Sequence, residues 1–484
     1  MVLLLRLLAS VVLVLQLPLS VQALHSTTPR RTPPPPPPRG CRFVLLGGTG
    51  QIGTAVASHL LQRAPPQSEI VLVGRRRVHE AVQQVLATPR PRPATAAAAH
   101  DKDDNTNDIS VRGVSVSDVW DTSDTTLQQL FNTADCVIHT AGPFLDRTPS
   151  TLKLAMQCKV PVYVDVSDPL PFLETSLLQN STAAAAGATT ALLAAGAFPG
   201  MSNVLAMEAA ESLADPVQNI HFCYYTAGLG GSGALNLYIT NLGFGEPMVQ
   251  YDGGALRFFT TLSGRLLGTI DFALPDSHTG GFGINDMKRR VGTKQVFSWP
   301  FPEAATVPVE LRARGSTLAC MGTAPDIWNT MLGLLVNVVP RPWWRSERFS
   351  KFLADFSEPL VWLSDRYLQW QDKDDGLGET HAMRVDVTRR DGSGVSILQG
   401  HASFRQCVAQ SCAEFALDCL QHPSPGVWLP EQRYRNASDR RRVLDKLTQT
   451  PGTFCYSGPI QLDKINPPTG VDAAIEKAVI DEAR

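Results

Sequence analysis

The stretch that decides the fold is 42–54, which reads RFVLLGGTGQIGT. Its apolar first residues predict a short buried strand that runs directly into a glycine-rich turn. Gly48, Gly50 and Gly53 satisfy the pattern G-x-G-x-x-G. In that pattern the first glycine permits a sharp turn, the second lets backbone approach a pyrophosphate, and the third lets a helix pack on the strand. The sequence therefore predicts a Rossmann-type dinucleotide site, with a helix over 54–62.

The phosphates of such a dinucleotide bind free backbone N–H groups at the start of the helix, where the helix dipole favours negative charge. The turn and the residues that follow it are therefore expected to contact the cofactor. These residues are Gly48, Thr49, Gly50, Gln51, Ile52 and Gly53.

The end of the next predicted strand, 69–73, indicates which dinucleotide binds. An NAD site usually carries an acidic residue about 20 residues past the glycines, where it holds the ribose 2′-hydroxyl. Here Gly74 is followed by Arg75, Arg76 and Arg77. A guanidinium suits the 2′-phosphate of NADP, because it binds phosphate as a planar fork. The alternative is a solvated basic turn, but the placement of Arg75 and Arg76 favours NADP over NAD.

The first 40 residues have the composition of targeting segments. Residues 1–23 are mostly apolar and end in Val21-Gln22-Ala23, whose small residues suit a signal peptidase. Residues 24–40 are rich in proline and arginine and lack acids, which is typical of a transit peptide. Together they resemble the bipartite presequence of algae with secondary plastids, with Leu24 after the cleavage point. A plastid location is therefore expected, with secretion or an uncleaved membrane anchor as the alternative.

Length and composition indicate a soluble enzyme of two domains. A chain of 484 residues is long enough for two or three cores. Its net charge of −2 gives no reason to expect a nucleic-acid partner. The nine cysteines are scattered without metal-ligand spacing, so no metal site and no disulfide framework is expected.

Beyond the second strand, predicted strands and helices alternate, as in a doubly wound parallel sheet. The further strands are expected at 109–116, 136–140, 160–166 and 189–194. Strand carboxyl ends open onto the ligand crevice in this fold. Ala141, Gly142 and Pro143 follow the fourth strand and form a turn of small residues. Such a turn would let backbone approach the nicotinamide.

Several motifs in this order resemble one family. GGTGQIG, LVGRR, HTAGPF, VYVDVSD and AGAFPGMSN follow the saccharopine dehydrogenase-like NADP-binding oxidoreductases. In the second half YYTAGLGGSG, MGTAPDIWN, MRVDV and PGVWLPE look like the plastid and cyanobacterial members. The resemblance covers residues 41 to 432, which is nearly the whole chain after its first 40 residues.

The resemblance implies an α/β architecture with two domains. A Rossmann domain would span 41–197, a second α+β domain that covers the crevice would span 198–405, and residues 406–432 would return to the first domain. Residues 433–484 are expected to form a peripheral tail. The family exchanges hydride between NADPH and a small metabolite such as a carbonyl, imine or enone. The alternative is a non-catalytic NADP(H)-binding sensor or assembly protein. The sequence does not fix the oligomeric state, and a homodimer is one option.

The sequence gives less information about the proton donor. The Tyr-x-x-x-Lys pair of short-chain dehydrogenases is absent, because none of the eight tyrosines has a lysine four residues later. The polar candidates are Asp165, Asp168, Ser202, Asn203, Tyr224 and Tyr225, of which we single out Asp165, Asn203 and Tyr225. Each has a structural alternative: Asp165 could cap a turn, Asn203 could cap a helix, and one of two adjacent tyrosines on a strand must face away.

Three other segments have two interpretations each. The glycine-dense stretch 228–233 is a loop or a second anion nest, and the former is favoured. The basic triplet 288–290 is a solvated turn or a contact for an acidic substrate. The apolar run 327–339, followed by Trp343 and Trp344, is a buried helix or a membrane-surface contact, and it is too short to span a bilayer.

Overall fold

The computed structural model describes residues 40–89, 109–180, 187–213, 216–227, 233–259, 264, 266–272, 291–324, 326–371, 380–448 and 453–460. The chain from Arg39 onward forms one compact unit, distinct from Met1–Pro38. The expected targeting segments lie outside the described residues, apart from Gly40. Most of the glycine-dense stretch 228–233 and the basic triplet 288–290 also lie outside them.

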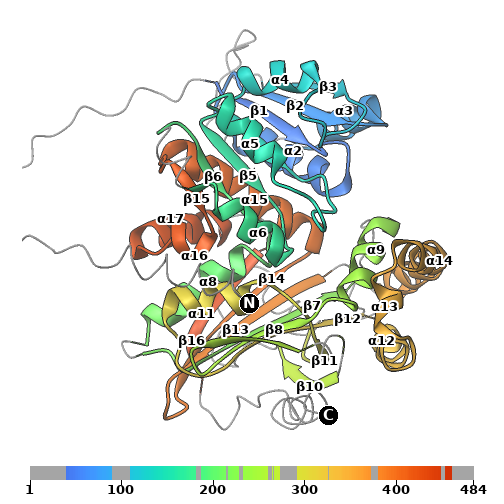
Figure 1. Ribbon diagram of the computed structural model, residues 1–484, viewed down its shortest axis with the longest axis vertical. Coiled ribbons are helices and arrows are strands. Elements are labelled where there is room, and N and C mark those ends of the chain that lie inside the picture. The colour runs from blue at the N-terminus through green and yellow to red at the C-terminus, as the bar shows by residue number, and fades with distance from the viewer. Residues whose placement is uncertain are drawn as a thin grey trace, which may run out of the picture. The chain divides into compact units, whose positions relative to one another are not determined.

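The first sheet has seven strands, and every pair in it is parallel. Its strands are β1 (Arg42–Leu46), β2 (Glu69–Gly74), β3 (Ser110–Ser115), β4 (Cys136–His139), β5 (Val162–Asp165), β6 (Thr190–Leu192) and β15 (Gly426–Trp428). They lie in the order β15-β6-β5-β4-β1-β2-β3 (Figure 1). The order reverses between β1 and β4, and ligands bind beside such a switch point in open α/β sheets.

Helices cover both faces of this sheet. Phe43 and Leu45 pack in one core with the helices α2 (Gln51–Arg63) and α3 (Val78–Leu86). Val44 and Leu46 pack in another core on the opposite face. The helices on that face are α4 (Thr125–Asn132), α5 (Ser150–Gln157) and α6 (Leu170–Leu177). Central strands buried on both faces read as continuous apolar runs. The predicted doubly wound Rossmann-type sheet is therefore confirmed.

The second sheet is mixed and also has seven strands. They are β7 (Asn219–Ala227), β10 (Leu266–Asp271), β11 (Thr293–Ser298), β12 (Thr317–Thr323), β13 (Thr380–Thr388), β14 (Gly394–His401) and β16 (Thr453–Ile460), in the order β10-β11-β12-β7-β13-β14-β16. A hairpin of β8 (Met248–Asp252) and β9 (Ala255–Phe259) lies beside it. The predicted second α+β domain is thus confirmed.

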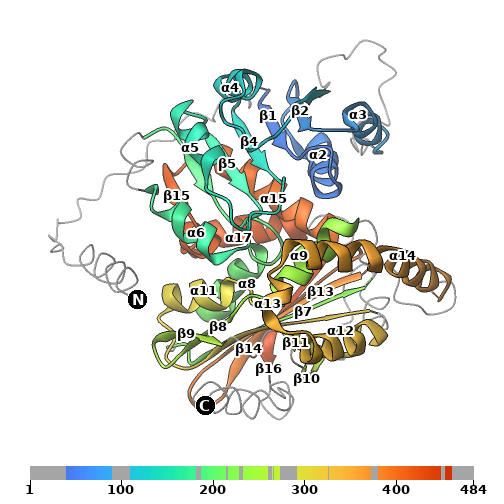
Figure 2. The same ribbon diagram turned by 45° about the vertical axis from the view of Figure 1, so that its right-hand side comes forward.

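Two groups of helices accompany the second sheet. α8 (Met201–Glu211) and α11 (Glu303–Leu311) pack on one side. The other group is α9 (Gly233–Gly243), α12 (Asp326–Val338), α13 (Arg341–Trp344) and α14 (Glu347–Gln371), which gather together in Figure 2. α12 differs from the predicted buried helix, because Leu334 and Val338 are 64% and 70% exposed. In the described part of the chain no helix is long and apolar enough to cross a membrane.

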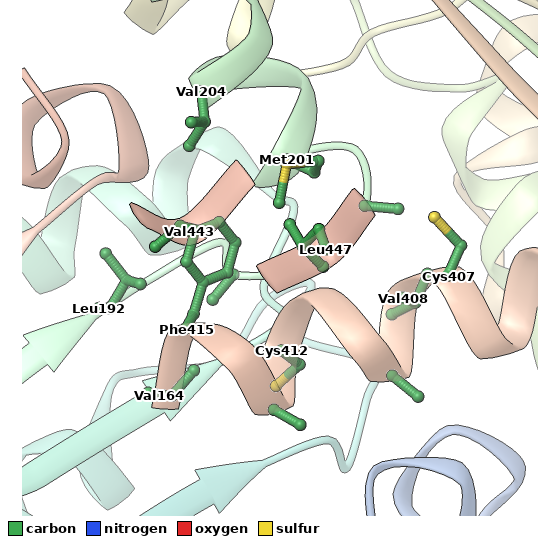
Figure 3. Close-up of a cluster of buried hydrophobic side chains, with 14 of the residues drawn as sticks. Val164, Leu192, Met201, Val204, Cys407, Val408, Cys412, Phe415, Val443 and Leu447 are labelled. Carbon is green, nitrogen blue, oxygen red and sulfur yellow. The ribbon is translucent and has the colours of Figure 1, made fainter. Parts of the chain in front are cut away.

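One helix, α15 (Phe404–Gln421), links the two halves of the chain. It packs against α2 and β5 of the first domain and also contacts β13 and β14. Figure 3 shows Cys412 and Phe415 of this helix near Val164 and Leu192 of the first sheet. The same core contains residues of α8 and of α17 (Ala437–Thr448). The segment predicted to return to the first domain therefore contains most of α15, followed by β15.

The end of the chain differs from the predicted peripheral tail. After α16 (Pro430–Arg433), Val443 and Leu447 of α17 are buried in the main core. Arg440, within the charged run 439–442, is 2% exposed and its Nε donates to Glu208 at 3.1 Å. β16 pairs with β14 and forms an edge of the second sheet. The sequence indicated a peripheral segment here, but an acidic partner on α8 allows Arg440 to be buried.

Candidate functional site

The glycine turn after β1 is shaped by close backbone contacts. Gly47, not Gly48, has the left-handed conformation, with φ of +76°. A Cβ on Gly48 would lie 2.9 Å from Leu72 Cα, so this position needs glycine for its approach to β2. A Cβ on Gly53 would lie 2.2 Å from Gly47 O, so the third glycine lets α2 pack on the turn. The sequence correctly indicated the turn, but it assigned the sharp bend to Gly48, whereas Gly47 has the positive φ.

Gly50 is different, because it is exposed and a Cβ there would meet only Gly47 O, at 3.2 Å. The turn is therefore open at the point where a pyrophosphate would approach. The N-terminus of α2 has no side-chain cap and no acidic residue in its first turn. The first N–H groups of a helix have no intrahelical partner. The residues present therefore fit an anionic dinucleotide at Gly50, Gln51 and Ile52.

The side chain of Thr49 packs against the end of β2, where a Cβ on Gly74 would lie 2.2 Å from Thr49 Oγ1. The next residues, Arg75 and Arg76, are exposed. Neither forms a hydrogen bond or ion pair within the described residues, whereas Arg77 Nε donates to Glu80 at 2.7 Å. Two cations and no carboxylate thus follow β2 directly, where the adenosine ribose lies in this fold.

Ala141, Gly142 and Pro143 form the turn after β4, with a cis peptide bond between Gly142 and Pro143. A Cβ built on Gly142 would lie 3.9 Å from Ile239 Cδ1 of α9, so the turn comes close to the second domain. Pro143 also lines a cavity of about 580 Å³. Its other lining residues are largely polar or charged and include Asp146, Arg147, Tyr238, Glu246, Arg345 and Glu347.

A second cavity, of about 200 Å³, is mainly apolar. Asp168 and Phe198 contribute to it from the carboxyl edge of the first sheet. The second domain contributes the remaining walls, among them Ile239, Trp299, Phe301, Trp328 and Leu353. We call this the apolar cavity. It combines a carboxyl group with an apolar wall beside the edge where the predicted dinucleotide site lies.

Asp168 is the acidic residue that lines the apolar cavity. Burial raises the pKa of its carboxyl to about 6, and the nearby charge of Asp165 contributes in the same direction. A carboxyl with this pKa can hold or release a proton near neutral pH, as a general acid or base requires. The sequence placed Asp168 at a strand end but did not single it out.

In the structure Asp165 has a structural role, because its carboxylate accepts hydrogen bonds from neighbouring segments. Its Oδ1 accepts hydrogen bonds from the N–H and hydroxyl of Ser167, at 3.1 and 2.5 Å, and from the N–H of Ala194 at 3.2 Å. These contacts join the end of β5 to the segment after β6. Burial raises the pKa of Asp165 to about 6 as well, but its side chain does not line the apolar cavity.

Asn203 is also occupied in structural contacts. Its Oδ1 accepts from the N–H of Gly200 at 2.9 Å and its Nδ2 donates to Glu431 at 2.8 Å. The side chain thus caps α8 and connects it to α16. This is the alternative that the sequence gave for Asn203, and it does not place the amide in the apolar cavity.

The two adjacent tyrosines face opposite sides of β7, as strand geometry requires. Tyr225 packs near Phe272, with ring centroids 6.0 Å apart, in a core separate from the first domain. Tyr224 stacks on Phe198, with centroids 4.2 Å apart, and its hydroxyl donates to Glu303. The sequence singled out Tyr225. Tyr224 is instead the tyrosine that packs against Phe198, a residue of the cavity wall.

Two residues near the site were missed. One is Glu303, which accepts a hydrogen bond from Tyr224. Burial raises the pKa of Glu303 to about 8, so its carboxyl is protonated at neutral pH. The Arg405 guanidinium donates to Gln51 Oε1 at 2.8 Å and so reaches the start of α2 from α15. Nothing in the sequence links Arg405 to a turn 354 positions away, because only the packing of α15 brings them together. Within the described residues no cluster of three His, Cys, Asp or Glu side chains could hold a metal ion.

No protein-family model matches the chain, and no curated protein matches it. Solved structures show distant similarity. A probable dehydrogenase from Thermotoga maritima is 9% identical over 84% of this chain and 94% of its own, with a TM-score of 0.37. GenD2 from gentamicin A biosynthesis, in complex with NAD, is 11% identical over 90% and 100%, with a TM-score of 0.34. Pen from Bacillus thuringiensis is 17% identical over 32% and 52%, with a TM-score of 0.21.

Two of these neighbours are thus a probable dehydrogenase and a protein solved in complex with NAD. The chain spans about half the length of the Bacillus protein that it matches. At such low identity and TM-score, the choice of cofactor and substrate depends on the residues of this chain itself.

Proposed function

We propose that the protein is an NADP-dependent oxidoreductase of the saccharopine dehydrogenase-like type. It would transfer hydride between NADPH and a small metabolite that carries a carbonyl, imine or enone group. The observation that carries the proposal is the placement of two features at one sheet edge. An open glycine turn with an uncapped helix follows β1, and Asp168, whose side chain lines the apolar cavity, comes three residues after β5 at the same edge.

The chain supplies a binding group for each part of the cofactor. Gly50 and the N–H groups at the start of α2 would hold the pyrophosphate. Arg75 and Arg76 would pair with the 2′-phosphate, where a carboxylate would repel it. The turn of Ala141, Gly142 and Pro143 would lie near the nicotinamide. Arg405, which already reaches Gln51, would add a cation over the phosphate turn.

When bound, NADPH would supply a hydride to the electrophilic carbon of the substrate, and the π bond of that carbon would break. Asp168 would hold the proton that the oxygen, nitrogen or neighbouring carbon then takes up. The raised pKa of Asp168 keeps part of the carboxyl protonated near pH 6. The apolar walls around it would exclude water and so favour this neutral form.

A second candidate is a non-catalytic NADP(H)-binding sensor or assembly protein. The glycine turn alone suits both functions. Asp168 favours the enzyme, because binding alone gives no reason to place a half-buried carboxyl on the wall of an apolar cavity, where its charge is costly. We further propose a plastid location, from the presequence, and a homodimer as the assembly.

The test is a turnover assay on the chain from Gly40. Carbonyls, imines and enones are offered one at a time, and oxidation of NADPH is followed by its absorbance. With a substrate that is turned over, Asp168→Asn should lower kcat by about 100-fold and leave NADPH binding unchanged. NADPH binding without turnover of any compound in these classes would favour the sensor.

A further inference from the structure

The helices around the apolar cavity present large apolar side chains to solvent. On α12, Leu334 and Val338 are exposed, and on α14 Phe352, Phe356 and Leu363 are exposed. Phe352 and Phe356 lie one helical turn apart and stack on each other, with ring centroids 6.3 Å apart. Soluble proteins rarely gather so many exposed aromatic and aliphatic side chains, and such gatherings mark interaction sites. We call the exposed apolar side chains of α12 and α14 the apolar face.

The inner sides of the same two helices line the apolar cavity. Leu332 and Leu335 of α12 contribute to its wall, and so do Leu353 and Ser357 of α14. Met331 both lines the cavity and is 37% exposed, so the wall of the cavity reaches the surface at α12. Each helix is therefore apolar on two sides, one toward the cavity and one toward solvent.

We propose that the apolar face docks on the surface of a lipid bilayer and that the apolar cavity receives the apolar part of a lipid-like substrate. An amphipathic helix that lies in a membrane interface has aromatic and aliphatic residues on one face and charged residues on the other. On α14, the charged residues Arg348, Lys351 and Asp355 are exposed and flank the apolar stripe on the solvent side of the helix. Figures 1 and 2 place α12, α13 and α14 near one another, as docking on one surface requires.

The tryptophan chemistry of this region favours a bilayer. Trp362 is 60% exposed, and the guanidinium of Arg366 lies 5.0 Å from its ring centroid. Trp343 on α13 is also exposed. Tryptophan is enriched where a membrane meets water, because its ring is apolar while its N–H remains hydrogen-bonded. Arginine extends its charged end toward the headgroups from the same depth.

A lipid bilayer explains both the apolar face and the apolar cavity. A second copy of the chain would cover the apolar face, but it would leave the apolar cavity beneath the face unexplained. A bilayer covers the face and also contains the molecules that would fill an apolar cavity whose wall reaches the surface at Met331. The substrate half of the proposal rests on the proposed function: the reducible group would lie at Asp168 and the apolar chain would lie against α12 and α14.

Docking is tested by flotation of the chain from Gly40 with phosphatidylcholine vesicles. This segment keeps all but the first residue of the compact unit that begins at Arg39, and it lacks the apolar residues 1–23. The protein should float with the vesicles, and high salt should not release it, because apolar burial is not screened. Phe352→Ser with Phe356→Ser should lower the bound-to-free ratio by about tenfold or more.

The matched control replaces Leu178 and Val309 by serine. Both are exposed by more than half but lie on α11 or just after α6, away from the apolar face. The control protein should float like the unchanged protein, and all variants should keep the same thermal midpoint and NADPH titration. Equal flotation of the two double variants, or no flotation of the unchanged protein, would overturn the docking proposal. Conversion of a dimer to a monomer by the Phe352 and Phe356 changes, without vesicle binding, would show that a second copy covers the face.

The cavity is tested separately with a fatty acid whose fluorescence rises in apolar surroundings. Uptake should be saturable, and Leu335→Trp, which fills space in the cavity, should weaken it by about tenfold while flotation and NADPH binding remain. Unchanged uptake in Leu335→Trp, or no saturable uptake, would overturn the substrate class. Because NADPH binding is measured in the same samples, a failure here is distinguishable from a failure of the proposed cofactor site.

Discussion

The glycine turn and the apolar cavity belong to the same edge of the first sheet, but they are built in different ways. The turn takes its shape from backbone atoms, and most of its contacts come from residues 45–74. The cavity takes its shape from side chains on segments between residues 168 and 404, spread over both domains. A turn that is shaped by the backbone of neighbouring residues can be predicted from a short sequence motif. A cavity formed by distant side chains can be read only after the chain has folded.

This difference explains which predictions were confirmed. The doubly wound sheet and the second α+β domain followed from strand and helix patterning, which depends on neighbouring residues. Gly48, Gly50 and Gly53 were recognised because their spacing is itself the signal. The bend was placed at Gly48 instead of Gly47, since spacing alone does not show which residue has a positive φ.

The proton donor shows the opposite case. Asp165 ends β5 and Asp168 comes three residues later, so the sequence could not separate them. Hydrogen bonds from Ser167 and Ala194 hold Asp165, whereas Asp168 lies on the cavity wall. Likewise, strand alternation predicted that Tyr224 and Tyr225 face apart but did not tell which one faces the first domain. Which tyrosine faces the first domain depends on which side of the second sheet packs against that domain.

The tail shows how charge alone can mislead. The run of charged residues from Asp439 to Arg442 was interpreted as part of a peripheral tail. Arg440 is nevertheless buried against Glu208, which lies 232 positions earlier in the sequence. The sequence contains both partners, but nothing in it signals that they meet.

The largest effect on NADPH binding and stability should come from a substitution at Gly53, which disrupts the glycine turn. Gly53→Ala would force a Cβ to 2.2 Å from Gly47 O, so NADPH binding should fall by about 100-fold and stability by about 3 kcal/mol. Gly50→Ala is the matched control, because its Cβ meets only one backbone atom, at 3.2 Å. It should keep the melting temperature and lose only NADPH affinity. Equal melting temperatures for the two variants would contradict the proposed division between packing and binding.

The next effect tests the assembly of distant segments. Arg440→Ala leaves the carboxylate of Glu208 without its buried partner and should lower the free energy of unfolding by about 3 kcal/mol, measured by urea titration. Arg441 reaches the same carboxylate at 3.5 Å but is 64% exposed. Arg441→Ala should therefore cost no more than about 0.5 kcal/mol. If both variants unfold at the same urea concentration, α17 is peripheral after all.

The third prediction concerns the pH dependence that Asp168 gives to stability. The pKa of Asp168 is raised from 3.8 to about 6 in the folded protein, so folding favours the protonated form. The stability it contributes is present below the unfolded pKa and is lost as pH rises through about 6. Asp168→Asn removes this cost and should stabilise the protein by about 1 to 3 kcal/mol at pH 8. The gain should vanish at pH 3.5. A stability difference that does not change between these two pH values would show that Asp168 titrates normally.

The smallest effect concerns the residue after β2. Replacing Arg75 by Asp puts a carboxylate where the ribose 2′-hydroxyl would lie and repels a 2′-phosphate. Preference for NADPH over NADH, expected to be about fivefold or more, should disappear without a change in melting temperature. Replacing Arg77, whose guanidinium pairs with Glu80, should leave the preference as it was. An unchanged ratio in the Arg75 variant would mean that the basic turn is only solvated.

The most direct test of the account is a fluorescence titration of the chain from Gly40 with NADPH and with NADH. NADPH should bind saturably at micromolar concentration, and NADH should bind more weakly by about fivefold or more. Binding of neither nucleotide would contradict the central claim. The open turn at Gly50 would then be a feature of the fold alone.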